Sequence, residues 1–214
     1  MITIELAKAH MIEAVEEALA VLLRGGIVAY PTETFYALGA RFDMPESLSR
    51  LYLLKKRPEK KAMPVIIGSA HLLSQVVSQK WLENIPPPVK CLMDRFWPGP
   101  LTLLMPAKEG LAELLTAGSG KVAVRIPGES FALHLAKKAG LPITATSANL
   151  SGMAPSVNAR EVAQYFNNRL DLLVSGSETA GGMPSTIVDA TTAALGLVRE
   201  GAIARAAFET CMKR

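Results

Sequence analysis

The spacing of apolar residues along the chain predicts an alternation of helices and strands. Between Leu6 and Leu23 apolar side chains recur at helical spacing, with glutamates on the opposite face, and Gly25 and Gly26 end the segment. The run from Ile27 to Tyr30 is short and apolar, as is typical of a buried strand, and Pro31 closes it. A helix that passes through a glycine turn into a strand is typical of α/β proteins.

The same alternation continues to the end of the chain. Further helices are expected over Glu46–Leu54, Val89–Arg95, Phe131–Lys138 and Ala159–Phe166. Further strands are expected over Val65–Ile67, Leu101–Met105, Val122–Ile126 and Pro142–Thr146, and around Leu172, Ile187 and Leu197. Because the strands outnumber the helices that can connect parallel neighbours, some pairs must be antiparallel. We therefore predict a single domain over residues 1–214, built as a mixed parallel and antiparallel sheet flanked by helices.

Length and composition permit one substantial core and argue against a membrane protein. Half of the 214 residues are apolar, but every apolar run is too short to cross a bilayer. The first residues lack the basic and apolar stretches of an export signal, so we expect a cytoplasmic protein. The net charge of +4 fits an anionic partner such as a nucleotide or a nucleic acid.

The cysteines and histidines form no recognisable metal or redox motif. Cys91 and Cys211 lie far apart and in no C-x-x-C pair, so we expect both to be ordinary thiols. His10, His71 and His134 are isolated from one another, and a histidine metal cage is not expected. A single catalytic histidine remains open.

Polar residues follow the first predicted strand, at the position where open α/β sheets place their ligand sites. Thr32, Glu33, Thr34 and Tyr36 share one loop there. They either orient a small polar substrate or cap backbone amides.

A basic run follows the second predicted helix. Residues 55–61 hold five cations, and Pro58 prevents the helix from continuing. The run either clamps phosphates or forms a solvated helix end favoured by the helix dipole. The strand that starts directly after the run favours the clamp.

Two further features indicate an anion site. Arg125 stands in an apolar strand, where an unpaired cation is costly, so it must meet an internal carboxylate or a bound anion. Residues 144–152 combine hydroxyls, an amide and a glycine in a pattern suited to a phosphate or adenosine. Ser185 and Arg199 provide further polar groups of this kind later in the chain. No P-loop motif is present.

Seven motifs in a fixed order make the chain similar to the YrdC/YciO family. They are Pro31-Thr32-Glu33-Thr34-Phe35-Tyr36, Lys55-x-Arg57-Pro58, Trp97-Pro98-Gly99-Pro100-Leu101-Thr102, Arg125-Ile126-Pro127, Thr146-Ser147-Ala148-Asn149-x-Ser151-Gly152, Ser185-Thr186-Ile187-Val188-Asp189 and Arg199-x-Gly201. The chain resembles the short form of the family, since it ends at Arg214 without the C-terminal domain of longer members. Ala37 and Ala62 differ from residues found in many members, which keeps the YciO-like branch as an alternative.

The resemblance implies a YrdC-like fold, a twisted mixed sheet with a basic concave surface, and a nucleotidyltransferase activity. The implied reaction makes threonylcarbamoyl-AMP and pyrophosphate from L-threonine, bicarbonate and ATP, with Mg²⁺ carried by the triphosphate. The implied partners are the threonylcarbamoyl-transferase proteins that use this product to modify tRNA, and tRNA or double-stranded RNA itself. A YciO-like paralogue or a non-catalytic double-stranded RNA-binding or ribosome-maturation factor remains the alternative.

The resemblance also implies roles for ten residues and no protein ligand for a metal. The catalytic pair would be Lys55 and Arg57; the residues for threonine or its carbamate would be Thr32, Tyr36, Lys61 and Arg125; those for ATP would be Lys55, Arg57, Ser147, Asn149, Ser185 and Arg199.

Overall fold

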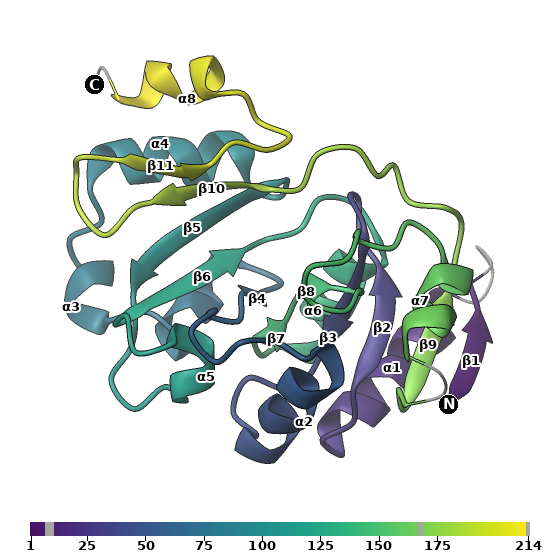
Figure 1. The fold of residues 1–214 in the computed structure, drawn as a ribbon. Coiled ribbons are helices and arrows are strands. Elements are labelled where there is room, and N and C mark those ends of the chain that lie inside the picture. Colours follow the sequence, from purple (N-terminus) through teal and green to yellow (C-terminus); the bar gives the residue numbers. More distant parts are fainter. Residues whose placement is uncertain (7–10, 167–168, 213–214) are drawn as a thin grey trace.

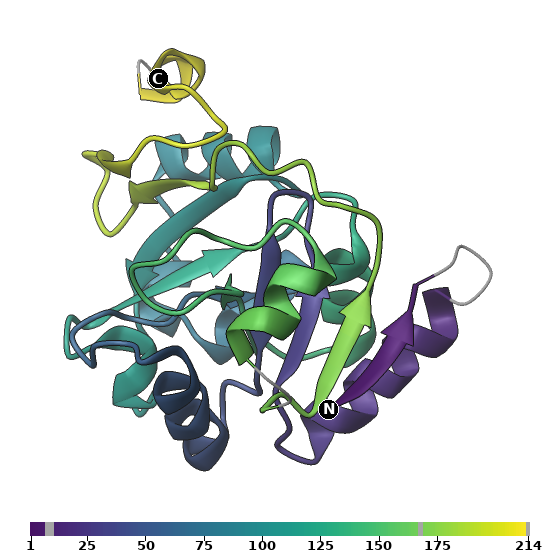
Figure 2. The same ribbon diagram turned by 45° about the vertical axis from the view of Figure 1, so that its right-hand side comes forward.

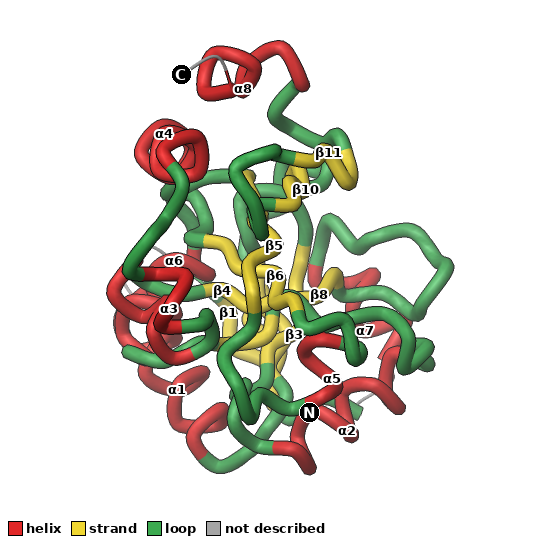
Figure 3. Tube along the Cα trace, turned by 90° about the vertical axis from the view of Figure 1, so that its left-hand side faces the viewer, coloured by secondary structure: helices red, strands yellow, loops and turns green. Residues whose placement is uncertain are grey.

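The computed structural model of the chain describes residues 1–6, 11–166 and 169–212. Strands occupy the centre of the molecule and helices lie around them, as the trace in Figure 3 shows. The two ends of the chain lie on opposite sides (Figures 1 and 2).

The strands form two mixed sheets. The first sheet has the order β1 (Ile2–Glu5), β9 (Leu172–Ser175), β2 (Val28–Pro31), β3 (Tyr36–Gly39) and β8 (Thr146–Ser147). The second has the order β11 (Gly196–Arg199), β10 (Thr186–Asp189), β5 (Leu101–Pro106), β6 (Lys121–Arg125), β4 (Val65–Ile66) and β7 (Ile143–Thr144). Parallel and antiparallel pairs occur in both sheets. The predicted mixed α/β architecture is therefore confirmed, with its strands divided between two sheets.

The helices surround these sheets. They are α1 (Met11–Leu23), α2 (Pro45–Lys55), α3 (Gln79–Leu82), α4 (Pro87–Phe96), α5 (Glu113–Thr116), α6 (Phe131–Ala139), α7 (Ala159–Phe166) and α8 (Arg205–Met212), with a 3₁₀ helix, η2, over Ala70–Gln75. The helix predicted from Leu6 is observed from Met11 onward; residues 7–10, which include His10, lie outside the described residues. None of the described helices has the length and apolar character needed to span a membrane.

Successive residues of β2 divide the apolar interior into two parts. Val28 and Tyr30 belong to a cluster formed with α1 and α6, whereas Ala29 belongs to a larger cluster that includes residues of both sheets. This alternation follows from the two-residue period of a strand, whose successive side chains point to opposite faces. Both faces of β2 are covered, which explains why its sequence is apolar throughout.

The observed strands differ from the predicted strands in two respects. The strands β1 and β3 were not expected, because Tyr36–Gly39 follows a polar loop and Ile2–Glu5 is mostly exposed. The predicted strand Pro142–Thr146 is two short strands, β7 in the second sheet and β8 in the first. Between them the amide of Ala145 donates to the carbonyl of Pro64. This segment therefore carries the chain from one sheet to the other.

A disulfide joins the C-terminal helix to the body of the protein. Cys91 of α4 is bonded to Cys211 of α8, with their Cα atoms 5.6 Å apart. The expectation of two ordinary thiols was wrong, because 120 residues separate the two cysteines in sequence while α8 packs on α4 in space. Nearby, Arg95 Nη1 of α4 donates to Thr210 Oγ1 of α8 over 2.5 Å.

Candidate active site

A cavity of about 800 Å³ is lined by residues of both sheets and of the loops that follow their strands. Most of the predicted site residues line it, namely Thr32, Tyr36, Arg57, Lys61, Arg125, Ser147, Ser185 and Arg199. Lys55 and Asn149 are not among its lining residues. A second hollow, of about 500 Å³ near Arg24 and Asp171, contains none of the predicted residues.

The charged residues that line the cavity are all basic. Arg57, Lys61, Arg125 and Arg199 contribute to it, and none of the described residues that line it is acidic. The pKa of Arg199 is lowered by burial and by the neighbouring charge of Arg125. Two guanidinium groups that repel each other in a partly buried cavity favour an anion between them.

The loop between β2 and β3 is stabilised by Thr32. Its Oγ1 donates to the carbonyl of Phe35 over 2.7 Å and accepts from the amides of Thr34 and Phe35. Of the two sequence interpretations of this loop, the capping contacts are therefore present. They leave Thr32 at the cavity wall with its hydroxyl already bonded within the loop.

Tyr36 forms part of the cavity wall although it is almost completely buried. Its hydroxyl accepts from the amide of Gly176 over 2.9 Å and donates to the carbonyl of the same residue over 3.3 Å. Burial raises the pKa of the Tyr36 phenol, so it remains protonated at neutral pH. The phenol thus connects β3 to the segment after β9.

The basic run after α2 turns one arginine toward the cavity. Arg57 donates from Nε to the carbonyl of Lys61 over 3.0 Å and from Nη2 to the carbonyl of Ala62 over 2.6 Å. Its guanidinium lies 6.0 Å from the ring centroid of Tyr52. Lys61 is exposed, and its ammonium has no hydrogen-bond partner among the described residues. The run therefore has one fixed cation and one adjustable cation at the cavity.

Lys55 takes a different position from the one expected for a phosphate ligand. Only 1% of the residue is exposed, and its ammonium donates to the backbone carbonyls of Ser147 and Asn149, the latter over 2.7 Å, and weakly to Asn149 Oδ1. The same Oδ1 accepts from Ser147 Oγ over 2.5 Å. Lys55 and Asn149 thus lie beneath the cavity, where they hold the segment that presents Ser147.

Ser185 and Arg199 form a polar pair on the opposite wall. Arg199 Nη2 donates to the carbonyl of Ser185 over 2.7 Å, and Ser185 Oγ lies 2.9 Å from Thr102 Oγ1. Both residues stand at the ends of neighbouring strands, β10 and β11, which are antiparallel. The pairing of these strands brings a hydroxyl and a guanidinium together at the cavity.

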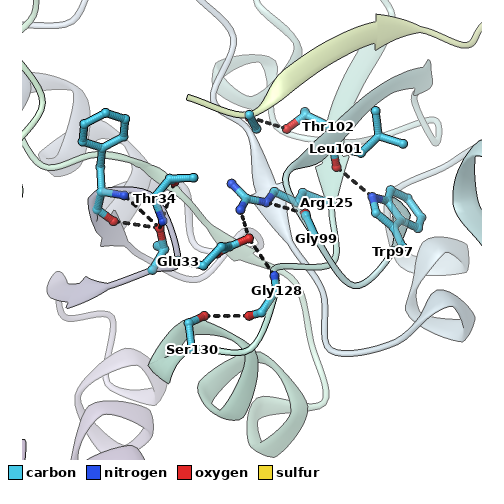
Figure 4. A network of polar contacts seen from close by, with 12 residues as sticks. Glu33, Thr34, Trp97, Gly99, Leu101, Thr102, Arg125, Gly128 and Ser130 are labelled. Atoms are coloured by element: carbon cyan, nitrogen blue, oxygen red, sulfur yellow. Dashed lines mark hydrogen bonds and ion pairs between the residues drawn. The ribbon is translucent and has the colours of Figure 1, made fainter. Parts of the chain in front are cut away.

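Arg125 meets an internal carboxylate, which resolves the alternative left open by the sequence. Its Nη2 pairs with Glu33 Oε1, and its Nε donates to the carbonyl of Gly99 over 3.0 Å (Figure 4). The carboxylate also accepts from the amide of Gly128 over 2.7 Å. The sequence placed Glu33 in a loop that could orient a small polar substrate, but it did not identify Glu33 as the partner of Arg125.

The described residues include no group of three or more histidine, cysteine or acidic side chains placed to hold a metal ion. Glu33 is the carboxylate beside the cavity, and it is already paired with Arg125.

Comparison with known proteins places these features in a family. The family model described as Telomere recombination (Sua5/YciO/YrdC) matches residues 20–201. A threonylcarbamoyl-AMP synthase of Pyrococcus abyssi is 36% identical over 179 residues, which are 84% of this chain and 51% of the relative. The chain therefore spans about half the length of that relative.

A second relative is similar over nearly its full length. The threonylcarbamoyl-AMP synthase of Vibrio parahaemolyticus is 31% identical over 87% of this chain and 98% of its own. Among solved structures, P. abyssi Sua5 complexed with L-threonine has a TM-score of 0.89 at 32% identity, covering 99% of this chain and 60% of that one.

Proposed function

The chain belongs to the Sua5/YciO/YrdC family, and from this premise we propose that it makes threonylcarbamoyl-AMP and pyrophosphate from L-threonine, bicarbonate and ATP. The observation that carries the proposal is the cavity, which gathers three arginines, a lysine and two serine hydroxyls without an acidic lining residue. Relatives named threonylcarbamoyl-AMP synthase support it.

The chemistry of this reaction requires stabilisation of negative charge. The threonine amine attacks carbon dioxide with loss of a proton, or bicarbonate with release of water, to form a carbamate. The carbamate oxygen then attacks the α-phosphorus, and the bond from this phosphorus to the bridging oxygen breaks, so that the oxygen leaves with pyrophosphate. Charge develops on the phosphoryl oxygens and on the leaving pyrophosphate, where fixed cations and hydroxyls lower the barrier. In this proposal Mg²⁺ enters on the triphosphate and neutralises part of its charge.

In this proposal one group of polar side chains binds the nucleotide, and a second group binds the amino acid. Arg57, Ser147, Ser185 and Arg199, which all line the cavity, bind the nucleotide phosphates in this proposal. The apolar side chains of Ile187 and Val198 offer a surface for the base. Arg57 and Arg199 are held by backbone carbonyls, Ser147 Oγ by Asn149 Oδ1 and Ser185 Oγ by Thr102 Oγ1, so all four groups are oriented before the substrate arrives.

The amino acid occupies the other side of the cavity in this proposal. Arg125 and Lys61 supply charge for its carboxylate, while Thr32 and Tyr36 shape the wall, because both hydroxyls already bond within the protein. The L-threonine bound to the similar P. abyssi Sua5 supports an amino-acid site in this fold.

Lys55 is assigned an organising role. Its ammonium holds the carbonyls of Ser147 and Asn149 from beneath and thereby fixes the position of Ser147 Oγ. Transfer of the threonylcarbamoyl group to tRNA by further proteins, in the cytoplasm, would consume the product. These partners and this location are part of the proposal.

The experiment is a pyrophosphate-release assay with the purified chain. ATP, L-threonine, bicarbonate and Mg²⁺ are expected to give pyrophosphate, with omission of threonine or bicarbonate abolishing it. Arg57→Ala should remove most of the turnover, by about 100-fold, as expected for loss of a donor to a developing anion. Lys60→Ala, an exposed cation of the same basic run, serves as the matched control and should retain turnover.

Three results would contradict parts of the proposal. Absence of threonine-dependent pyrophosphate would reject the synthase. Salt-sensitive binding of double-stranded RNA without turnover would instead favour the non-catalytic alternative. Full activity of Arg57→Ala would remove Arg57 from the phosphate site.

A further inference from the structure

Glu33 connects the two sheets at the edge of the cavity. It belongs to the loop between β2 and β3 of the first sheet, and its carboxylate reaches Arg125 at the end of β6 and Gly128 just beyond, both on the side of the second sheet (Figure 4). Ninety-two residues separate Glu33 from Arg125 in sequence. The side chain of Glu33 thus joins one cavity wall directly to the other.

The pairing leaves part of the Arg125 guanidinium available to the cavity. Nε donates to Gly99 and Nη2 donates to Glu33, while Arg125 lines the cavity and 12% of its side chain is exposed. A guanidinium carries five N–H groups in a rigid plane. Because two contacts on the protein side fix that plane, the remaining N–H groups are held in one orientation.

The carboxylate itself does not face the cavity. Glu33 is not among the lining residues, and its Oε2 is buried without a hydrogen-bond partner among the described residues. The space for it depends on Gly128, where an added Cβ would lie 3.1 Å from Glu33 Oε1. Glu33 therefore acts on the cavity only through Arg125. Gly128, which has no side chain, leaves room for the Glu33 carboxylate.

From these contacts we propose that Glu33 is a positioning residue for the amino-acid site, acting through the orientation of Arg125. This inference rests on the proposed function, because it assigns Arg125 to the amino acid. An unpaired Arg125 keeps its charge, but its guanidinium then rotates among several orientations, and fixing it again on binding costs entropy. Glu33 removes that cost in advance.

The test separates the ion pair from a general structural role. Glu33→Ala removes both contacts of the carboxylate, whereas Glu33→Gln keeps the size and an oxygen for the Gly128 amide but loses the charge that pairs with Arg125. We expect the Kd for L-threonine, measured by titration calorimetry, to rise about tenfold in Glu33→Ala and about threefold in Glu33→Gln, because charge-assisted bonds are about twice as strong as neutral ones.

A double-mutant cycle supplies the second readout. In an Arg125→Ala background, Glu33→Ala is expected to cause no further loss of threonine affinity, since its effect passes through Arg125. The Kd for AMP should stay unchanged, because the contacts that hold Ser185 and Arg199 do not include Glu33. Glu129→Ala is the matched control, as its carboxylate is 77% exposed in the neighbouring loop.

Each contrary result overturns the inference. Wild-type affinity in Glu33→Gln would assign the effect to the Gly128 contact alone. A loss that persists in the Arg125→Ala background, or an equal loss of AMP affinity, would indicate general distortion. Failure of the wild-type chain to bind L-threonine would instead reject the proposed function, and is thus distinguishable from failure of this inference.

Discussion

Two walls of the cavity are held in place by different kinds of interaction. The wall that carries Ser147 rests on the buried ammonium of Lys55, which donates to backbone carbonyls. The wall that carries Ser185 and Arg199 rests on Thr186 Oγ1, which donates to the carbonyl of Ile203 and accepts from the amides of Gly201 and Ile203. Beyond Ile203 the chain continues into α8, which the disulfide ties to α4.

Because of this difference, the two walls are expected to respond to different solution conditions. The first wall depends on a titratable group in the protein interior, so it responds to pH. The second depends on an uncharged hydroxyl and, further along the chain, on a covalent bond that responds to reduction. The two walls are therefore expected to fail independently.

Removal of the Lys55 ammonium should produce the largest effect. Lys55→Met leaves two backbone carbonyls without their donor and releases Ser147 from its fixed position. We expect turnover to fall about 100-fold, since a misplacement of about 1 Å at a reacting group costs that much. Turnover measured beside Lys60→Met, an exposed lysine of the same run, checks the prediction.

Hydrogen exchange distinguishes this organising role from direct contact with phosphate. In the ligand-free protein, amides of residues 146–151 should exchange faster in Lys55→Met than in the wild type, because the segment loses its anchor. Loss of turnover with unchanged exchange would show that Lys55 acts on the substrate itself and would remove the contrast between the walls.

Loss of the disulfide should have the next largest effect, on stability rather than on binding. Replacing Cys91 and Cys211 by alanine is expected to lower the free energy of unfolding by about 3 kcal/mol, which lies within the range typical of a disulfide. Urea denaturation measures this change. The affinity for AMP should remain, since Thr186 still holds the wall.

Reduction provides the control for this prediction. A thiol reductant should lower the urea midpoint of the wild type to that of the Cys91→Ala, Cys211→Ala variant and leave the variant unchanged. An unchanged wild-type midpoint would mean that the disulfide does not contribute to stability. A parallel loss of AMP affinity would mean that α8 supports the wall after all.

The sequence allowed the elements of the fold to be predicted better than the contacts between them. The strand around Arg125 follows from an apolar run, and the need for a carboxylate partner follows from the cost of an unpaired buried cation. The identity of that partner did not follow, because Glu33 is 92 residues away. Local patterns contain no information about which distant loops meet.

Lys55 and the two cysteines also show that local sequence patterns do not reveal contacts between distant segments. Lys55 ends α2 within a basic run, for which the sequence favoured a phosphate clamp over a solvated helix end. In the structure its ammonium is buried and donates to carbonyls more than 90 residues later in the chain. Cys91 and Cys211 become neighbours only because α8 returns to α4. By contrast, the hydroxyls and cations that follow strands were predictable, because strand ends of a sheet converge on common sites.

The smallest expected effect concerns the pH dependence of stability. It tests the difference between the wall held by Lys55, which can titrate, and the wall held by the Thr186 hydroxyl, which does not. Burial, with a contribution from the Arg57 charge, lowers the pKa of Lys55 from 10.5 to about 7. Between these values the unfolded chain binds one more proton at this position than the folded chain does. The free energy of unfolding therefore increases as pH rises from about 7 toward 10.5.

Urea denaturation at pH 7.5 and pH 8.5 measures this increase. For the wild type we expect this group to add about 1 kcal/mol across that interval, since one pKa unit corresponds to about 1.4 kcal/mol. Lys55→Met should lack this increment, whereas the variant without cysteines should retain it, because its altered wall contains no titrating lysine. Equal pH dependence in the wild type and Lys55→Met would show that the three oxygens around the ammonium offset its burial and keep Lys55 charged. In that case both walls would be insensitive to pH in this range, and only reduction would distinguish them.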